Sequence, residues 1–186
     1  MEKSVITAKD EIMGRETDLK KYHFPVGVLT FRTYKSSKGL LELLSANPVR
    51  HKLLFCLSPE QKPSPIYKAR VGGTDIIIVI NVVWGGPQTA IILEELATLG
   101  LKFVVGFGVT GSLCKKITPG KIVIAQSSFC LDGASKEYTN EEEFLADKDL
   151  LRVADKVAKQ NKIELIKGKG WTTDALYREY PSKIAK

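Results

Sequence analysis

Two glycine-rich loops flank one apolar segment, and their residue types suit ligand binding. The first loop, WGGP, places Gly85 and Gly86 directly after Trp84, and the second, GFGVTG, runs from Gly106 to Gly111. Glycines let main-chain N–H groups approach a ligand closely, and an indole ring offers a large apolar surface beside them. Tight turns and close strand packing require the same glycines. The pattern therefore fits either a binding site or two purely structural turns.

The elements that carry these loops alternate between strands and helices. Apolar runs predict strands over 26–31, 52–57, 66–71, 76–83, 102–109 and 163–171, and the segment 117–129 is predicted to be a turn followed by a strand. Helical periodicity predicts helices over 36–45, 88–99 and 147–162, and a last one that begins near Thr172 or Thr173. A Gly72–Gly73 hairpin adds antiparallel pairing to strands that are otherwise joined through helices. We therefore predict an α/β fold with a mixed sheet, in which both glycine loops leave carboxyl ends of strands, where such sheets bind ligands.

Composition describes a globular protein of one domain. The chain has 186 residues, of which 44% are hydrophobic and 26% charged. Its longest apolar run, 76–84, is much too short to cross a bilayer, and the charged N-terminus has no secretory signal. The net charge of +7 comes from lysines and arginines scattered along the chain, without a basic-aromatic motif. These features favour a cytoplasmic protein that binds neither membranes nor nucleic acids.

The cysteines and histidines do not suggest a metal site. Cys56, Cys114 and Cys130 have no CxxC spacing, and neither His23 nor His51 forms a ligand-like pair with a cysteine. An odd number of cysteines in a chain without a signal peptide indicates reduced thiols. We expect no bound metal.

Three blocks of the sequence together resemble the nucleoside phosphorylase family, which contains purine nucleoside phosphorylase, uridine phosphorylase and related nucleosidases. The blocks read VVWGGPQTAIILEELATLGLKFVVGFGVTGSL, ITPGKIVIAQSSFCLDGASKEY and GKGWTTDALYRE, in family order. The resemblance implies a three-layer α/β/α fold of the phosphorylase/hydrolase type with a mixed central sheet. It also implies cleavage of the N-glycosidic bond of a purine or pyrimidine nucleoside, with phosphate as co-substrate in a phosphorylase or water in a nucleosidase, and no metal or organic cofactor. Members of the family form dimers or hexamers, so a homo-oligomer is expected.

The resemblance places the sugar and the base against two tryptophans. Trp84 and Gly85 fall where the family contacts the ribose, and Trp171 falls where an aromatic ring stacks on the base. Asp174 occupies a motif position in the third block, where it could contact the ligand or cap the last helix. A packing role remains an alternative for both tryptophans.

Main-chain groups of the second glycine loop are expected to line the base. Val109, Thr110 and Gly111 have this position, and the Thr110 hydroxyl could add a hydrogen bond. Asp132 and Ser135 in DGAS also match family motif positions. No catalytic residue is assigned.

The sequence departs from the family at the phosphate site. The family's Pro-Gly-Asp-Pro loop is replaced by VLTFRTYKSSKG, in which Arg32, Lys35 and Lys38 are cations that could substitute or simply be solvated. Gly106 and Val109 replace a second arginine and a hydroxyl. Because a phosphate dianion loses charge-assisted partners through these changes, they argue against ordinary phosphorolysis.

Residues 1–186 are predicted to form a single domain that is shorter than the family at its C-terminus. The chain stops before the segments that hold the ribose-gripping glutamate and the aspartate of the purine site. His23, in the polar leader, could reach a neighbouring subunit's ribose or be an ordinary surface residue. Three functions remain open: a phosphorylase, a phosphate-independent nucleosidase, and a non-catalytic nucleoside-binding homologue.

Overall fold

The computed structural model describes residues 4–15, 22–49, 54–58, 60–82, 85–175 and 177–184. The chain falls into two compact units, residues 1–109 and 110–186. Each unit carries a β-sheet of its own. The organisation of residues 1–186 as a single domain stays a prediction.

The first unit (residues 1–109) alternates helices and strands. Its elements are α1 (Ala8–Met13), β1 (Val26–Thr30), α2 (Tyr34–Leu43), β2 (Asn47–Pro48), β3 (Ile66–Val71), β4 (Thr74–Val79), α3 (Gly86–Thr98) and β5 (Phe103–Phe107). The strands form one sheet in the order β2-β3-β4-β1-β5. Strands β4, β1 and β5 are parallel neighbours, whereas β3 pairs antiparallel with both β2 and β4. The sheet is therefore mixed, as the sequence predicts.

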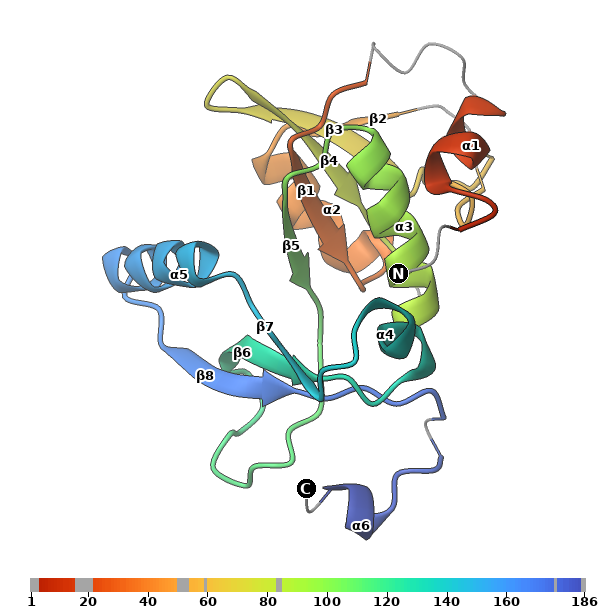
Figure 1. Cartoon of the computed structure of the whole chain (residues 1–186). Helices are drawn as coiled ribbons and strands as arrows, with labels where there is room; N and C mark the ends of the chain where they lie inside the picture. The colour runs from red at the N-terminus through yellow and green to blue at the C-terminus, as the bar shows by residue number, and fades with distance from the viewer. Residues whose placement is uncertain are drawn as a thin grey trace. The chain divides into compact units, whose positions relative to one another are not determined.

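Helices cover both faces of this sheet, which gives three layers (Figure 1). On one face, Ile77 and Val79 of β4 pack with residues of α1 and α3. On the other face, Ile76 and Ile78 pack with Leu41 of α2. A strand that is covered on both sides needs apolar residues at consecutive positions, and this requirement explains the uninterrupted run in β4.

The two connections predicted most sharply from the sequence are confirmed. Gly72 and Gly73 join β3 to β4 with φ angles of +56° and +82°, a conformation that glycine adopts readily. Helix α3 has Pro87 in its first turn and Gly100 with φ +90° after its end.

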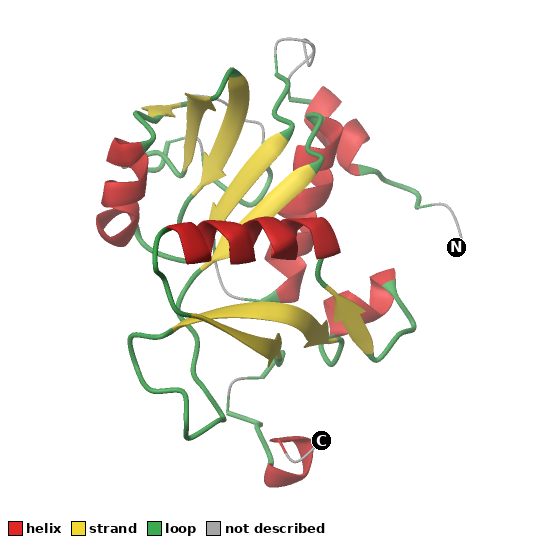
Figure 2. Ribbon diagram, turned by 90° about the vertical axis from the view of Figure 1, so that its left-hand side faces the viewer, coloured by secondary structure: helices red, strands yellow, loops and turns green. Residues whose placement is uncertain are grey.

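The second unit (residues 110–186) contains β6 (Ile122–Phe129), α4 (Gly133–Tyr138), β7 (Glu143–Leu145), α5 (Lys148–Gln160), β8 (Leu165–Gly170) and α6 (Pro181–Ile184). Its strands form a smaller sheet in the order β7-β6-β8, in which β6 is parallel to β8 and antiparallel to β7 (Figure 2). Helix α5 begins where the sequence predicts, because the Asp147 carboxylate accepts the N–H groups of Asp149 and Leu150.

Two predicted elements are wrong. Residues 54–58 form turns instead of a strand; Leu54 and Leu57 are buried in the core, so their apolar character serves packing. The long last helix is also absent: the described residues from Thr172 to Tyr180 are irregular, and only α6 follows. Pro181 is the first residue of α6, a position that proline tolerates, and because it lacks an N–H no helix from the preceding residues can continue through it.

Other elements were not predicted from the sequence, namely α1, β2, α4 and β7. Helix α1 begins with a capping box, in which Thr7 and Asp10 exchange hydrogen bonds. None of the helices in the described ranges is long and apolar enough to cross a membrane. The three cysteines are unpaired.

Candidate functional site

The carboxyl ends of three parallel strands meet at one edge of the first unit's sheet. Strand β1 lies between β4 and β5, in register with both. The chain leaves β1 for α2 on one face and leaves β4 for α3 on the other. Adjacent loops that diverge in this way open the crevice in which α/β sheets bind ligands. We call the described loop residues 31–33, 80–82, 85 and 108–109 the strand edge.

A network of buried hydroxyl groups holds the turn between β1 and α2. The side-chain oxygens of Thr30 and Ser37 are hydrogen-bonded at 2.9 Å, and both residues are fully buried. One of these hydroxyls donates to the other, and the Arg32 carbonyl oxygen lies 3.3 Å from the Thr30 hydroxyl and 3.5 Å from the Ser37 hydroxyl, so it accepts the remaining proton. The Asn81 N–H donates to the same carbonyl at 3.0 Å, which joins the loop after β4 to the loop after β1. The Arg32 peptide is therefore held by groups from both loops.

Sequence reasoning missed this hydroxyl network, although one signal for it existed. Ser37, Leu41 and Leu44 recur at helical spacing, so Ser37 occupies a position on the apolar stripe of α2. A polar residue on a buried stripe requires a hydrogen-bond partner. Thr30, the last residue of β1, is that partner.

The guanidinium of Arg32 provides a positive charge at the strand edge. This guanidinium donates to the Ser36 hydroxyl at 3.4 Å, and within the described ranges it has no carboxylate partner. Lys35 lies in the first turn of α2 and is exposed. An arginine without an acidic partner can bind an anion without first breaking an ion pair.

The first glycine loop has the strained geometry that its sequence indicates. Gly85 has φ +114° and precedes the first residue of α3, and its carbonyl accepts the Thr89 hydroxyl at 3.0 Å. Asn81 also adopts a positive φ, of +60°. Trp84 lies outside the described residues, so its predicted contact with the ribose stays a prediction.

Phe31 packs against two glycines of the second loop. A Cβ atom added to Gly106 would make an ordinary contact, 3.6 Å from the Phe31 ring, whereas one added to Gly108 would lie only 3.2 Å from the Phe31 Cβ. Close packing against Phe31 is therefore a structural reason for glycine at position 108 but not at position 106.

The residues that follow Gly108 are open to solvent. Val109 is 72% exposed, and the Thr110 hydroxyl donates to the Gly111 carbonyl at 3.2 Å. A Cβ atom on Gly111 would meet nothing within 4 Å. Val109 ends the first unit, whereas Thr110 and Gly111 belong to the second. Their main-chain groups are accessible, and their role in base binding stays a prediction.

In the second unit, Asp132, Ser135 and Asp174 build the N-terminus of α4. Asp132 is buried and accepts the Ser135 N–H at 3.0 Å and the Ser135 hydroxyl at 2.6 Å. Burial on its own would raise the pKa of Asp132, but these hydrogen bonds outweigh it and lower the pKa below its ordinary value.

Asp174 caps α4 and not the last helix. Its carboxylate accepts the Gly133 N–H at 2.8 Å, which brings the segment after β8 to the segment after β6. Trp171 directly follows Gly170 at the end of β8 and is half-buried. The expected capping role thus exists, but at a helix 41 positions earlier in the chain.

His23 lies at the opposite end of the first unit's sheet from the strand edge. A Cβ atom on Gly100, after the end of α3, would come within 2.6 Å of the His23 ring. His23 thus packs against this turn before β1 and is exposed. Across the described residues, no three His, Cys, Asp or Glu side chains gather as metal ligands would.

Comparison with known proteins adds to this geometry. The chain is 32% identical over 107 residues to a uridine phosphorylase of Salmonella typhimurium, a match that covers 58% of this chain and 39% of that protein. The matches to the first curated relatives span only 39–43% of those proteins' own length.

Two solved structures share the fold. A purine nucleoside phosphorylase from Toxoplasma gondii, solved with immucillin-H, aligns with a TM-score of 0.71 at 20% identity, covering 89% of this chain and 64% of that one. A futalosine hydrolase mutant of Helicobacter pylori aligns with a TM-score of 0.65 at 16% identity, covering 86% and 72%.

A sequence model of the phosphorylase superfamily matches residues 37–186, which include the strand-edge loops after β4 and β5 and all of the second unit, but not Arg32. Since this match covers most of the chain, the protein belongs to the phosphorylase superfamily, the nucleoside phosphorylase family that its three sequence blocks resemble.

Proposed function

We propose that this chain cleaves the N-glycosidic bond of a nucleoside by phosphorolysis, and that the strand edge holds the phosphate. The observation that carries the proposal is the Arg32 guanidinium, which has no acidic partner in the described ranges and whose peptide the hydroxyl network fixes. The uridine phosphorylases among the relatives favour a pyrimidine nucleoside as the first substrate to test. The resemblance implies that no metal or organic cofactor takes part.

The chemistry requires a nucleophile on one face of a ribose that develops positive charge. Arg32, with Lys35 as a second cation, would hold phosphate through charge-assisted hydrogen bonds and orient one oxygen toward the anomeric carbon. A fixed donor is worth more than a mobile one, because it loses little freedom when the anion binds. The hydrogen bonds that the Arg32 carbonyl accepts from the hydroxyl pair and from the Asn81 N–H supply this fixation for the main chain.

The nucleoside itself is assigned to the residues that the resemblance indicates. We propose Trp84 and Gly85 for the ribose, and Val109, Thr110 and Gly111 for the base. In the second unit, Trp171 and Asp174 are further candidates for the base. Asp174 already accepts one N–H group, so a ligand would compete with the cap of α4 for its carboxylate.

A phosphate-independent nucleosidase is the second candidate, and Phe31 favours it. Where the family has an arginine before the second glycine loop, this chain has Gly106 with the Phe31 ring against it. An apolar ring in place of a cation weakens the attraction for a phosphate dianion. The structural likeness to a futalosine hydrolase agrees with this alternative.

Turnover assays distinguish the two candidates. The purified chain is incubated with uridine, inosine and adenosine, with and without inorganic phosphate, and the free base is measured. Phosphorolysis predicts that base release rises with phosphate to saturation and yields ribose 1-phosphate. Base release at the same rate without phosphate, with free ribose as product, would establish the nucleosidase. No turnover of any nucleoside, with ligand binding retained, would contradict both.

Oligomeric state is a separate proposal. We propose that the chain forms a homo-oligomer, a dimer or a hexamer, as the family does. Light scattering coupled to size-exclusion chromatography tests this, and a mass of one 20.6 kDa chain at assay concentration would contradict it.

A further inference from the structure

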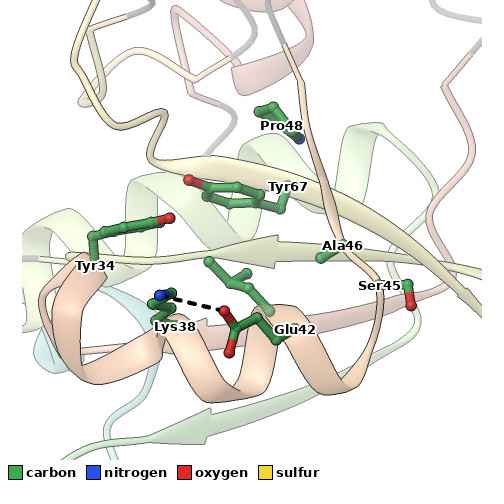
Figure 3. A pocket seen from close by; sticks show the side chains of 8 residues that line it. Tyr34, Lys38, Glu42, Ser45, Ala46, Pro48 and Tyr67 are labelled. Atoms are coloured by element: carbon green, nitrogen blue, oxygen red, sulfur yellow. Dashed lines mark ion pairs between the residues drawn. The ribbon is translucent and has the colours of Figure 1, made fainter.

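A hollow of about 320 Å³ lies in the first unit, on the α2 face of the sheet (Figure 3). Helix α2 lines it with Tyr34, Lys38, Leu41 and Glu42, the turn after α2 adds Ser45 and Ala46, and β2 and β3 add Pro48 and Tyr67. Its volume is at the lower end of those found for small-molecule sites. It shares no lining residue with the strand edge, so it is a second place at which this unit could hold a ligand.

Tyr67 gives this hollow an unmet hydrogen-bonding requirement. The residue is only 6% exposed, yet its hydroxyl makes no hydrogen bond with the described part of the chain. In Figure 3 the hydroxyl groups of Tyr67 and Tyr34 point toward one another across the hollow. A buried hydroxyl without a partner is costly, so its partner is expected to come from whatever fills the hollow.

The protonation state of Tyr67 makes it a donor. Burial raises the pKa of its phenol, and the neighbouring Tyr34 raises it further. The hydroxyl therefore remains protonated at neutral pH and offers its proton to an acceptor. Leu41, which is 5% exposed, provides an apolar surface nearby.

The charges on the rim cancel. Lys38 and Glu42 form an exposed ion pair with 3.5 Å between nitrogen and oxygen. An anion in the hollow would lie beside Glu42 and a cation beside Lys38, so either one meets repulsion as well as attraction. An uncharged occupant avoids this conflict.

We propose that the α2 hollow binds a small, uncharged aromatic molecule that carries a carbonyl oxygen. Its ring packs on Leu41 and Pro48, and its carbonyl accepts the Tyr67 hydroxyl. This site is independent of the strand edge and does not require the proposed enzymatic activity.

Nuclear magnetic resonance titration of the isotope-labelled full chain tests the proposal with three probes. Benzamide has the carbonyl and no charge, benzoate has a charge, and toluene has no acceptor. Benzamide is expected to shift signals of Tyr34, Leu41 and Ala46 with millimolar affinity, and more strongly than benzoate. Tyr67→Phe removes only the hydroxyl and is expected to weaken benzamide about fivefold or more while leaving toluene unchanged.

Two further variants distinguish a specific loss of binding in the hollow from misfolding of the chain. Tyr177→Phe changes a tyrosine that is 90% exposed in the second unit and should bind benzamide as the unmodified chain does. Ala46→Leu fills the hollow and should abolish binding of all three probes, with the remaining spectrum unchanged. Benzamide shifts that are absent from α2, equal affinity in Tyr67→Phe, or tighter binding of benzoate would each overturn the proposal.

Discussion

The side-chain oxygens of Thr30 and Ser37 lie 2.9 Å apart in a fully buried contact that joins the last residue of β1 to α2. Together they hold the Arg32 carbonyl, which the Asn81 N–H also reaches from the loop after β4. In the family's pattern a glycine loop occupies this turn. Here a pair of hydroxyls fixes the turn by side-chain hydrogen bonds, and Arg32, with its positive charge, belongs to this turn.

Removing either hydroxyl is expected to loosen the strand edge. Thr30→Val and Ser37→Ala each remove the buried hydrogen bond between the two hydroxyls and one contact with the Arg32 carbonyl, so each should lower the free energy of unfolding by about 1–3 kcal/mol. If the network positions Arg32, both variants should also raise the KM for phosphate several-fold, with a smaller change in kcat. Urea denaturation and steady-state kinetics measure the two effects.

Thr30→Ser is the control for this pair, because it keeps the hydroxyl and removes only a methyl group. Thr30→Ser should have the same KM for phosphate as the unmodified chain, although it is less stable because a methyl contact is lost. A phosphate KM that stays unchanged in Thr30→Val and Ser37→Ala, despite lost stability, would mean that the network serves folding alone.

The two glycine loops should respond differently to alanine. Gly85 has φ +114°, so Gly85→Ala imposes backbone strain of about 1–3 kcal/mol at the start of α3. A Cβ atom on Gly106 finds an ordinary contact 3.6 Å from Phe31, so Gly106→Ala should change stability by less than about 0.5 kcal/mol. Thermal unfolding of both variants checks this, and equal losses would contradict the assigned backbone geometry.

Sequence patterns predicted the layers of the first unit because a strand that is buried on both faces has apolar residues at consecutive positions. The run from Ile76 to Val79 and the helix from Gly86 to Thr98 follow from periodicity, glycine turns and proline placement. The failed elements share a physical cause: Leu54 and Leu57 pack into the core from turns, and apolar character alone does not distinguish a turn from a strand.

The site was harder to predict, because its contacts join residues that are distant in sequence. Asp174 was expected near the helix that follows it, yet it caps α4 through Gly133. Phe31 and Gly106 meet only because β1 and β5 pair in parallel, with Thr30 opposite Phe107. Neither relationship can be read from local spacing, whereas Ser37 on an apolar stripe could have been noticed.

Glu95 is expected to make stability depend on pH. It is 2% exposed in α3; both of its oxygens accept the Phe55 N–H at 3.0 Å, and Arg15 lies 3.6 Å away. Burial raises the pKa of this carboxyl, although the Phe55 N–H and Arg15 oppose the rise. Since the folded state holds the proton more tightly than the unfolded state, the contribution of Glu95 to stability is largest below the ordinary pKa of 4.5 and decreases as pH rises through the raised value.

Two variants of Glu95 separate its charge from its hydrogen bonds. Glu95→Gln keeps an acceptor for Phe55 and should flatten the pH dependence of the unfolding free energy above pH 4.5. Glu95→Leu leaves the Phe55 N–H unpaired and should cost about 1–3 kcal/mol at every pH. Urea denaturation between pH 4 and pH 8, with the exposed Glu60→Gln as control, measures both. A steeper dependence in Glu95→Gln would contradict this account.

Asp132 should make stability depend on pH in the opposite direction from Glu95. Its pKa is lowered, so its contribution is present above the ordinary value of 3.8 and is lost as pH falls below it. Asp132→Asn should therefore destabilise the chain by about 1–3 kcal/mol at neutral pH and reduce the loss of stability on acidification. Asp149→Asn, at a carboxylate that is 79% exposed, should change neither. An acid transition that is identical in Asp132→Asn and the unmodified chain would exclude this role.

The most direct test of the central claim is the dependence of uridine cleavage on phosphate in Arg32→Gln. Arg70→Gln is the matched control, since Arg70 is a 70% exposed arginine at the hairpin of the same unit. If the strand edge holds phosphate, Arg32→Gln raises the KM for phosphate about tenfold or more through the loss of charge-assisted bonds, and Arg70→Gln leaves it unchanged. The same phosphate saturation curve in Arg32→Gln and the unmodified chain would contradict the account.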